Sequence, residues 1–345
     1  MDRLAVLLAS LALVVSAGEG VGAEPLKLAA PTPEAGNTYA RAFSTVLTQL
    51  GTPLSYDQVM GLSGVAFALQ IDTAGPTLPD GELDCAWWPN DAWGFDLGLP
   101  LLRQATGWEL RKVRCDLNRH LADSSAEFRR ALLPLIAPEL NAGRPVLAEN
   151  DHCFVITSVD ADAAAPPILG YGTKGHATSF GAETMRCPSY PWGLYLLGER
   201  RPAADAAALD LASLRHIVAL WNEQAQGPDA PPTRFSGRKA WAEWLKLLHA
   251  GQAHDNNMLI HLRYNRASAV AYLRAMARRH TGALAEHLNA AAALYQQVLD
   301  AALATELPNL GPTKGGPAAY EAMVERAADL EAKAIGELVA ALAGG

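Results

Sequence analysis

The sequence of 345 residues has no cluster of basic residues, and it has no apolar run long enough to cross a bilayer. It carries 28 Lys and Arg against 36 Asp and Glu, a formal net charge of −8. This acidic balance argues against binding to a nucleic-acid backbone, which requires clustered basic side chains. A membrane-spanning helix needs about 20 apolar residues, so we expect none in the mature chain. Hydrophobic residues make up 50% of the chain, which is enough for a packed core.

Cysteine is also scarce, and its spacing fits no metal motif. No CxxC or HxxxH pattern occurs, so the sequence predicts neither a zinc site nor another cofactor. The cysteines are four in number: Cys85, Cys115, Cys153 and Cys187. An even set in an oxidising compartment predicts two disulfide bonds, with three pairings open and free thiols as the alternative.

The N-terminus has the pattern of an export signal. An apolar run at residues 4–15 follows Arg3, and small residues ending in VGA at Ala23 resemble a signal-peptidase site. We therefore expect residues 1–23 to be a signal peptide of a periplasmic or secreted protein, with an uncleaved membrane anchor as the alternative. Residues 24–36, rich in Pro and Ala, are predicted to form an extended lead-in.

The rest of the chain predicts an α+β domain followed by a helical one. Helical periodicity covers residues 37–50, 55–60, 95–105 and 128–140, and alternating or apolar strands cover 109–113, RPVLAEN, HCFVITSVD, ILGYG and 192–198. Helices followed by an antiparallel sheet form an α+β arrangement. From residue 204 onward the pattern is alanine-rich and helical, which predicts an all-α domain at 204–343.

His152 is the most suggestive single residue, because it opens a predicted strand. A histidine held at the edge of a sheet can act as a general base near neutral pH. The alternative is a hydrogen-bonded polar residue at the end of a strand. Alternation along the strand puts the side chain of Cys153 on the opposite face.

The helix at residues 37–50, the segment LSYDQVMGLSGVAF and the strand HCFVITSVD resemble the N-terminal domain of the butirosin biosynthesis protein H family. They are similar, more distantly, to the bacteriocin-processing peptidases that cleave double-glycine leaders. The resemblance covers roughly residues 37–200 and implies a papain-like domain. In these families a cysteine at the start of the first helix attacks a carbonyl, and a strand-borne histidine takes its proton. An acidic or amide residue on the next strand orients the histidine, and an upstream glutamine helps bind the oxyanion.

Only the histidine of this set matches, at His152. The nucleophile position falls on Thr38, whose hydroxyl is a poor nucleophile and is suited to capping the helix. The oxyanion position holds Thr32, and the orienting position near Gly170–Gly172 holds no Asp or Asn. We therefore expect a catalytically degenerate protein that binds a peptide or acyl-bearing ligand in the former active-site cleft.

Cys85 supplies the alternative, in which a thiol meets His152 from another direction. The chain would then be a thiol-dependent acyltransferase or peptidase, unless Cys85 is held in a disulfide bond.

The predicted ligand-binding residues are aromatic. Trp87, Trp88 and Trp93 lie among polar residues, where flat rings could line a groove or instead cover the sheet. Tyr171 belongs to the segment GYGTKGH, which lacks the full phosphate-loop motif. A third reading assigns the function to the helical half, as a surface that binds a protein partner.

Overall fold

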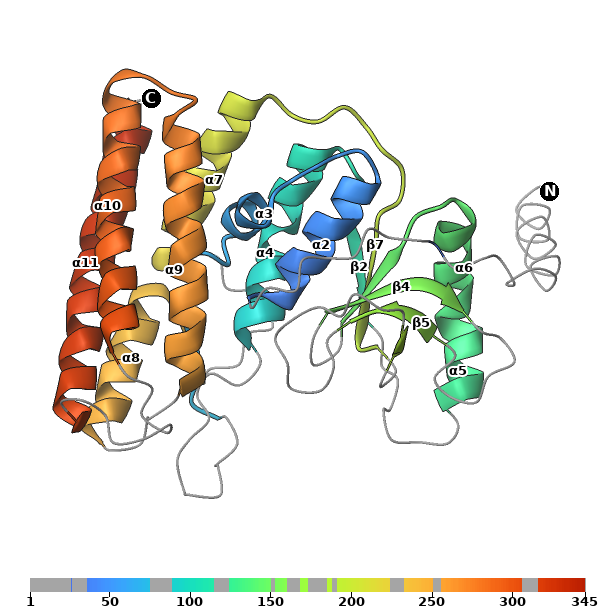
Figure 1. Cartoon of the computed structure of the whole chain (residues 1–345), viewed down its shortest axis with the longest axis horizontal. Coiled ribbons are helices and arrows are strands. Elements are labelled where there is room, and N and C mark those ends of the chain that lie inside the picture. The colour runs from blue at the N-terminus through green and yellow to red at the C-terminus, as the bar shows by residue number, and fades with distance from the viewer. Residues whose placement is uncertain are drawn as a thin grey trace, which may run out of the picture. The chain divides into compact units, whose positions relative to one another are not determined.

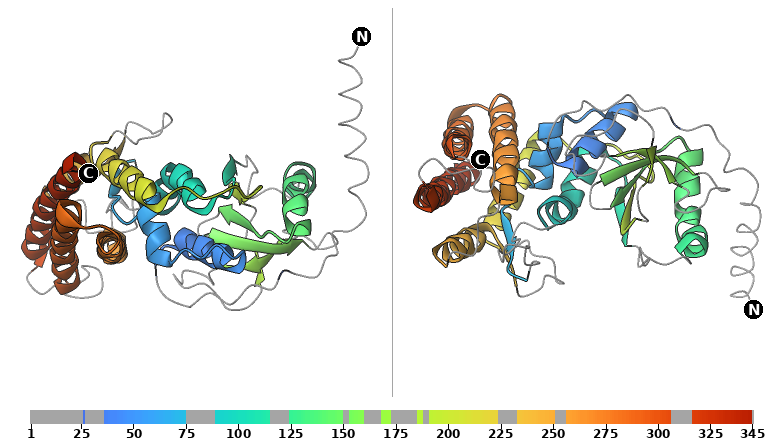
Figure 2. Two further views of the ribbon diagram at one scale, coloured as in Figure 1. Left: turned by 90° about the horizontal axis from the view of Figure 1, so that it is seen from above. Right: turned by 60° about the horizontal axis from the view of Figure 1, so that its bottom comes forward.

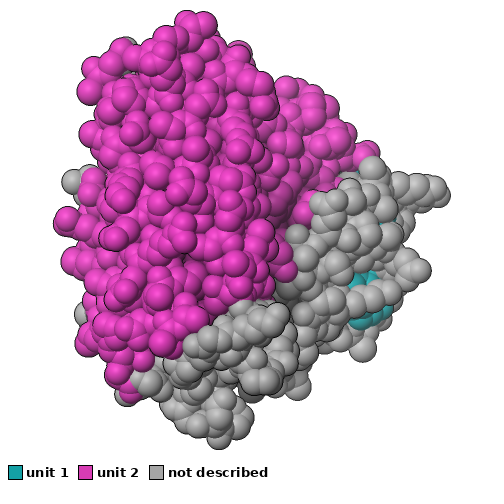
Figure 3. All heavy atoms as spheres, turned by 60° about the vertical axis from the view of Figure 1, so that its left-hand side comes forward, with its two compact units in different colours: residues 1–34, 111–198 teal, residues 35–110, 199–345 magenta. Residues whose placement is uncertain are grey.

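The structure is a computed structural model, and it describes residues 26, 36–74, 89–114, 124–149, 153–159, 168–172, 185–187, 191–223, 233–250, 256–305 and 316–344. Helices and antiparallel strands together confirm the α+β class (Figure 1). The chain divides into two compact units, coloured separately in Figure 3. Unit 1 comprises residues 1–34 and 111–198, and unit 2 comprises residues 35–110 and 199–345.

Unit 1 is built on an antiparallel sheet. Among the described residues the sheet has six strands in the order β2-β7-β3-β4-β5-β6. The strands are β2 (Arg111–Arg114), β3 (Val146–Glu149), β4 (Cys153–Val159), β5 (Ile168–Tyr171), β6 (Met185–Arg186) and β7 (Gly193–Leu196). The strands β3 and β4, which the sequence predicts as RPVLAEN and HCFVITSVD, are paired, with Val146 opposite Ile156 and Glu149 opposite Cys153. The strand β6 carries too short a pattern to have been predicted.

Two helices, α5 (Ser124–Ala131) and α6 (Leu133–Asn141), lie against one face of this sheet (Figure 2). The sequence predicts a single helix at 128–140, but the structure breaks it at Leu132. Pro134 stands in the first turn of α6, where it lacks an N–H and excludes the preceding turn from a continuous helix. Gly143 has a φ of 72° and ends the helical segment as expected.

The core of unit 1 lies between these helices and the sheet. Phe154 and Ile156 of β4 point into it, together with Phe128 and Ile136. The predicted alternation of β4 holds there, but the register shifts between Ile156 and Ser158. All seven residues of β4 are buried, so both faces of the strand are covered.

Unit 2 contains the remaining helices and a small two-stranded sheet. Its helices are α2 (Thr38–Gln49), α3 (Tyr56–Ser63), α4 (Pro89–Thr106), α7 (Ala206–Trp221), α8 (Gly237–His249), α9 (Asn256–Ala277), α10 (Gly282–Ala304) and α11 (Gly316–Gly344). The helices α9, α10 and α11 run side by side in Figures 1 and 2. The strands β1 (Gln70–Asp72) and β8 (Arg234–Ser236) pair antiparallel, so residues 204–343 are not entirely helical.

The boundary between the units differs from the predicted division at 37–200 and 204–343, because α3 packs on α9. Gly61 of α3 leaves room for the ring of Tyr272, which a Cβ at position 61 would meet at 2.1 Å. Ser268 donates a hydrogen bond to Asp57 Oδ1 at 2.7 Å. These contacts group the first helices with the C-terminal ones.

A buried ion pair sits at the centre of unit 2. Arg266 of α9 is fully buried and pairs with Glu331 of α11. Arg266 Nη1 also donates to the carbonyl oxygen of Ala66 at 2.9 Å and to that of Ala68 at 3.2 Å. Burial raises the pKa of Glu331, and the charge of Arg266 opposes that rise. The pair thus links α9, α11 and the chain that follows α3.

In the part of the chain that the structure describes, no helix is both long enough and apolar enough to cross a bilayer. The predicted signal peptide at residues 1–23 lies outside the described residues.

Candidate functional site

Most of the predicted site residues fall outside the described part of the chain. These are His152, Cys85, Trp87 and Trp88. Trp93 belongs to α4, but its side chain is also outside the described part. The described residues that adjoin the predicted positions along the chain lie in β4 and β5 of unit 1 and, separately, in α2 of unit 2.

Thr38 is the first residue of α2, as the resemblance implies for the nucleophile position. Its side chain is buried, with 2% of its surface exposed. The cap of the helix is Asn37 instead, because Asn37 Oδ1 accepts a hydrogen bond from the amide of Ala40 at 2.9 Å. The amide of Asn37 in turn donates to the hydroxyl of Tyr56 at 2.8 Å. The capping role predicted for Thr38 is therefore wrong.

The described start of β4 lies beside the end of β5. The two strands are antiparallel, with Val155 opposite Tyr171 and Ile156 opposite Gly170. The orienting position of the family falls on this segment of β5. Steric packing explains the glycines at positions 170 and 172, because the ring of Phe154 lies against both.

Phe154 occupies the space that a side chain on β5 would need. A Cβ at Gly172 would meet Phe154 Cδ2 at 2.5 Å, and one at Gly170 would meet the carbonyl oxygen of Val155 at 1.8 Å. Distances below 3.0 Å require a neighbour to move. A bulky aromatic ring thus fills the space beside Gly170 and Gly172, the segment on which the resemblance places an acidic or amide side chain. The glycines are visible in the sequence. Only the pairing of β4 with β5 shows that Phe154 fills the space beside them.

At the edge of β4 that faces β3, an ion pair and a contact with an aromatic ring connect residues of β2, β3 and β7. Glu149 at the end of β3 accepts from Lys112 Nζ of β2 at 2.6 Å, and 12% and 15% of these two side chains are exposed. The ammonium group also lies 5.2 Å from the centre of the Tyr195 ring. Gly193 on β7 makes room, since a Cβ there would meet Glu149 Oε2 at 2.5 Å. The pair fixes the carboxylate of Glu149 near the start of β4.

The two cysteines that the structure describes are shielded from solvent. Cys153 and Cys187 are both buried and form no disulfide bond, which corrects the prediction of two disulfide bonds. Burial raises the pKa of the Cys153 thiol well above its usual range, and the charge of the neighbouring Glu149 raises it further. Cys153 therefore favours its protonated form. Both Cys153 and Cys187 are buried and pack as small apolar residues, Cys187 in the core of unit 1. Cys85 and Cys115 lie outside the described residues.

Tyr171 is largely buried, with 8% of its surface exposed. It stands at the end of β5, opposite Val155. Only a small part of its surface is available to a ligand in this structure. Its position nevertheless marks the end of β5 that adjoins the start of β4.

A separate cluster in unit 2 has the chemistry to hold a metal ion. It consists of His249, Glu321 and Glu325, from α8 and α11. The two glutamates are four residues apart on one helix face, which is visible in the sequence. The histidine is 72 residues away from Glu321, so no local spacing could have revealed it.

The comparisons with known proteins add no family assignment. No protein-family model matches the sequence, and no curated protein matches it.

Proposed function

We propose that the chain is an exported protein whose papain-like domain, at residues 37–200, binds a peptide or acyl-bearing ligand without turning it over. The placement of the Phe154 ring against Gly172 is the observation that carries the absence of turnover in this proposal. In an acyl-transfer site of this class the orienting group fixes the tautomer of the histidine, and its loss costs about 10⁴-fold in rate. A side chain at position 172 would have to displace Phe154.

The nucleophile position supports the same conclusion. Thr38 is buried at the start of α2, and at neutral pH a hydroxyl is a much poorer nucleophile than a thiol. The described thiol nearest in sequence to His152 is Cys153, which is held protonated. The antiparallel pairing of β3, β4 and β5 supports the papain-like interpretation.

The binding claim is tested with two probes chosen from the resemblance. One is a dye-labelled peptide ending in two glycines, and the other is the octanoyl thioester of N-acetylcysteamine. Fluorescence anisotropy and calorimetry should show binding of at least one probe, and mass spectrometry should show that it remains intact. Failure of both probes to bind, or cleavage of either one, would overturn the proposal.

Aromatic variants locate the binding surface. Trp87→Ala and Trp88→Ala should weaken binding, since stacked rings supply contact area at low entropic cost. Leu303→Ala is the matched control, because Leu303 is an apolar side chain of α10 with 59% of its surface exposed. Equal affinities of all three variants and the wild type would remove these tryptophans from the proposed site.

The alternative function, thiol-dependent acyl transfer or peptide cleavage by Cys85 with His152, predicts a different result with the same thioester. Catalysis would release free N-acetylcysteamine over many turnovers. Both Cys85→Ser and His152→Ala would abolish that release, because the thiolate and its base act as a unit.

Export is tested on the full-length chain expressed in a bacterial host. Intact mass measurement of the protein recovered outside the cytoplasm should give a chain that begins near Glu24. A chain that retains residues 1–23 in the membrane fraction would support the uncleaved anchor instead.

A further inference from the structure

We propose that His249, Glu321 and Glu325 form a binding site for a divalent transition-metal ion, with Zn²⁺ as the best match. Each residue offers one ligand atom, and these atoms all lie within 4.8 Å of one another. The site lies within unit 2 and does not depend on the ligand-binding function proposed above.

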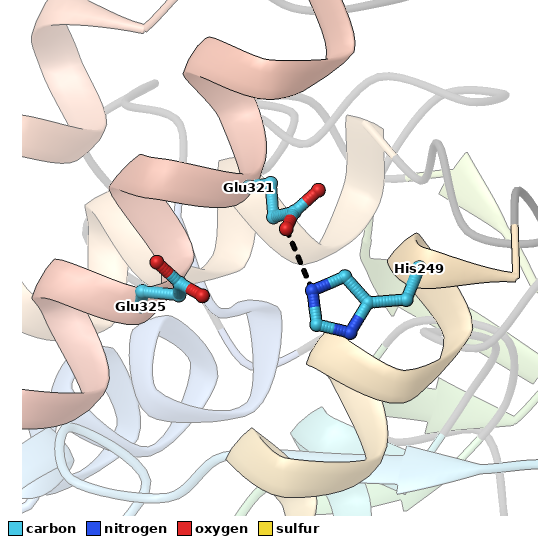
Figure 4. Close-up of side chains that lie close together, drawn as sticks. All are labelled: His249, Glu321 and Glu325. Atoms are coloured by element: carbon cyan, nitrogen blue, oxygen red, sulfur yellow. Dashed lines mark hydrogen bonds and ion pairs between the residues drawn. The ribbon is translucent and has the colours of Figure 1, made fainter.

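The geometry brings two helices to one point (Figure 4). His249 is the last residue of α8, and its Nε2 lies 2.6 Å from Glu321 Oε1. Glu325 lies one turn further along α11, and its carboxylate points toward the same space as that of Glu321. An imidazole from one helix therefore faces a pair of carboxylates from another.

The hydrophobic core holds these ligands in place. Tyr320 and Val324, which precede the two glutamates, are buried in a cluster that also contains Trp244 and Leu248 of α8. The rings of Trp244 and Tyr320 meet edge to face, with their centres 6.1 Å apart. Each ligand thus adjoins a core residue, and a site on packed helices is positioned more accurately than one on loops.

The charge of the cluster favours a cation. Glu325 makes no hydrogen bond or ion pair with any residue that the structure describes. The imidazole of His249 is bonded to Glu321 alone of the two carboxylates. Two carboxylates near each other repel, and a divalent ion among the three ligands would neutralise both.

The donor set selects the class of metal. One imidazole nitrogen with two carboxylate oxygens suits Zn²⁺ and related first-row ions. Zinc binds these atoms at about 2.0–2.2 Å, which places ligand atoms about 3.4 Å apart in a tetrahedral site. Small side-chain rotations would reach that spacing. His249 and Glu325 are exposed, which leaves the fourth position to water.

A similar pair in the same helical unit provides a matched control. His287 Nδ1 lies 2.7 Å from Glu337 Oε2, and 35% of each side chain is exposed. No third ligand joins this pair among the described residues. A histidine–glutamate pair alone should bind zinc weakly, so His287→Ala should leave the proposed site intact.

Calorimetric titration of the tag-free full chain with ZnCl₂ tests the proposal. The wild type and His287→Ala should each show one zinc ion bound per chain at this site, and binding should raise the melting temperature in both. His249→Ala and Glu325→Gln should weaken that binding by about 10-fold or more, since each removes a direct ligand. Both changes lie on the surface, and unchanged circular dichroism without zinc confirms that the variants fold.

Identical zinc isotherms and melting shifts in the wild type, His249→Ala and Glu325→Gln would overturn the proposal. They would assign any zinc bound to other groups, such as the thiols. Loss of binding in His287→Ala equal to that in His249→Ala would also contradict it.

Discussion

The aromatic ring of Phe154 and the bare backbone of Gly172 fit together across two neighbouring strands of the sheet. Any Cβ at position 172 would come within 2.5 Å of that ring. The fit explains locally why the segment ILGYG carries no acidic side chain at the position where the resembling families place one. A larger side chain at position 172 would have to displace the Phe154 ring.

Gly172→Ala should lower the free energy of unfolding by about 1–3 kcal/mol, because it overpacks this contact. Urea denaturation measures the effect. Gly336→Ala is the control, since nothing lies within 4 Å of a Cβ there and alanine favours the helix α11. Phe154→Leu should recover part of the loss in the Gly172→Ala background. Strictly additive costs would show that the two positions are not coupled.

Arg266→Met should destabilise unit 2 by about 3–5 kcal/mol, because it leaves the buried carboxylate of Glu331 without its partner. The double variant Arg266→Met with Glu331→Leu should lose less than the single one. Lys246→Met serves as the control, since its pair with Glu243 lies on the surface and contributes under about 1 kcal/mol. Chemical denaturation followed by circular dichroism separates these cases. A double variant less stable than Arg266→Met alone would refute the account of the pair.

His216 should make the stability of unit 2 depend on pH. Burial lowers the pKa of His216, and the hydrogen bond from its Nε2 to the carbonyl oxygen of Ser63, at 3.3 Å, opposes that shift only in part. The unfolded chain then binds a proton at a higher pH than the folded chain. The stability is fully present above the unfolded pKa, about 6.5, and declines as the pH falls toward the folded pKa.

His216→Gln should reduce this decline, because glutamine does not titrate but can still donate a hydrogen bond. Unfolding measured at several values of pH from 8 to 5 gives the difference between variant and wild type. A difference that stays constant over that range would contradict the assigned role of His216.

Much of the local structure follows from periodicity. The spacing of Ala42, Phe43, Val46 and Leu47 predicts α2, and the structure buries all four residues. The spacing of Ser55 and Gln58 is typical of a capping box, and the structure forms one at the start of α3. The pairing of β3 with β4 also follows from sequence, because two short apolar strands adjoin each other along the chain.

The unit boundary could not be predicted in this way. Arg266 reaches the carbonyl oxygen of Ala66 across 200 residues, and a fully buried arginine has no local signal. The alanine-rich pattern of α9 shows that it is a helix but not which helix it meets. The same limit applies to His249 and Glu321, which only the packing of α8 on α11 brings together.

The packing of the described residues near the predicted site could not be predicted from the sequence. The resemblance marked Gly170–Gly172 as lacking an acidic residue, and the strand register then showed Phe154 in that space. The even number of cysteines, four in all, predicts disulfide bonds that include Cys153 and Cys187. Both residues are instead buried in unit 1 without forming a disulfide bond.

The central claim is that the chain has no catalytic thiol, and thiol labelling of the folded mature protein tests it most directly. A maleimide probe is applied with and without reductant, and the labelled cysteines are identified by mass spectrometry. Cys153 and Cys187 should react only after unfolding, because both are buried. The labelling rates of the wild type and His152→Ala should be the same. Fast labelling of Cys85 in the wild type that is lost in His152→Ala would instead show an activated catalytic thiol.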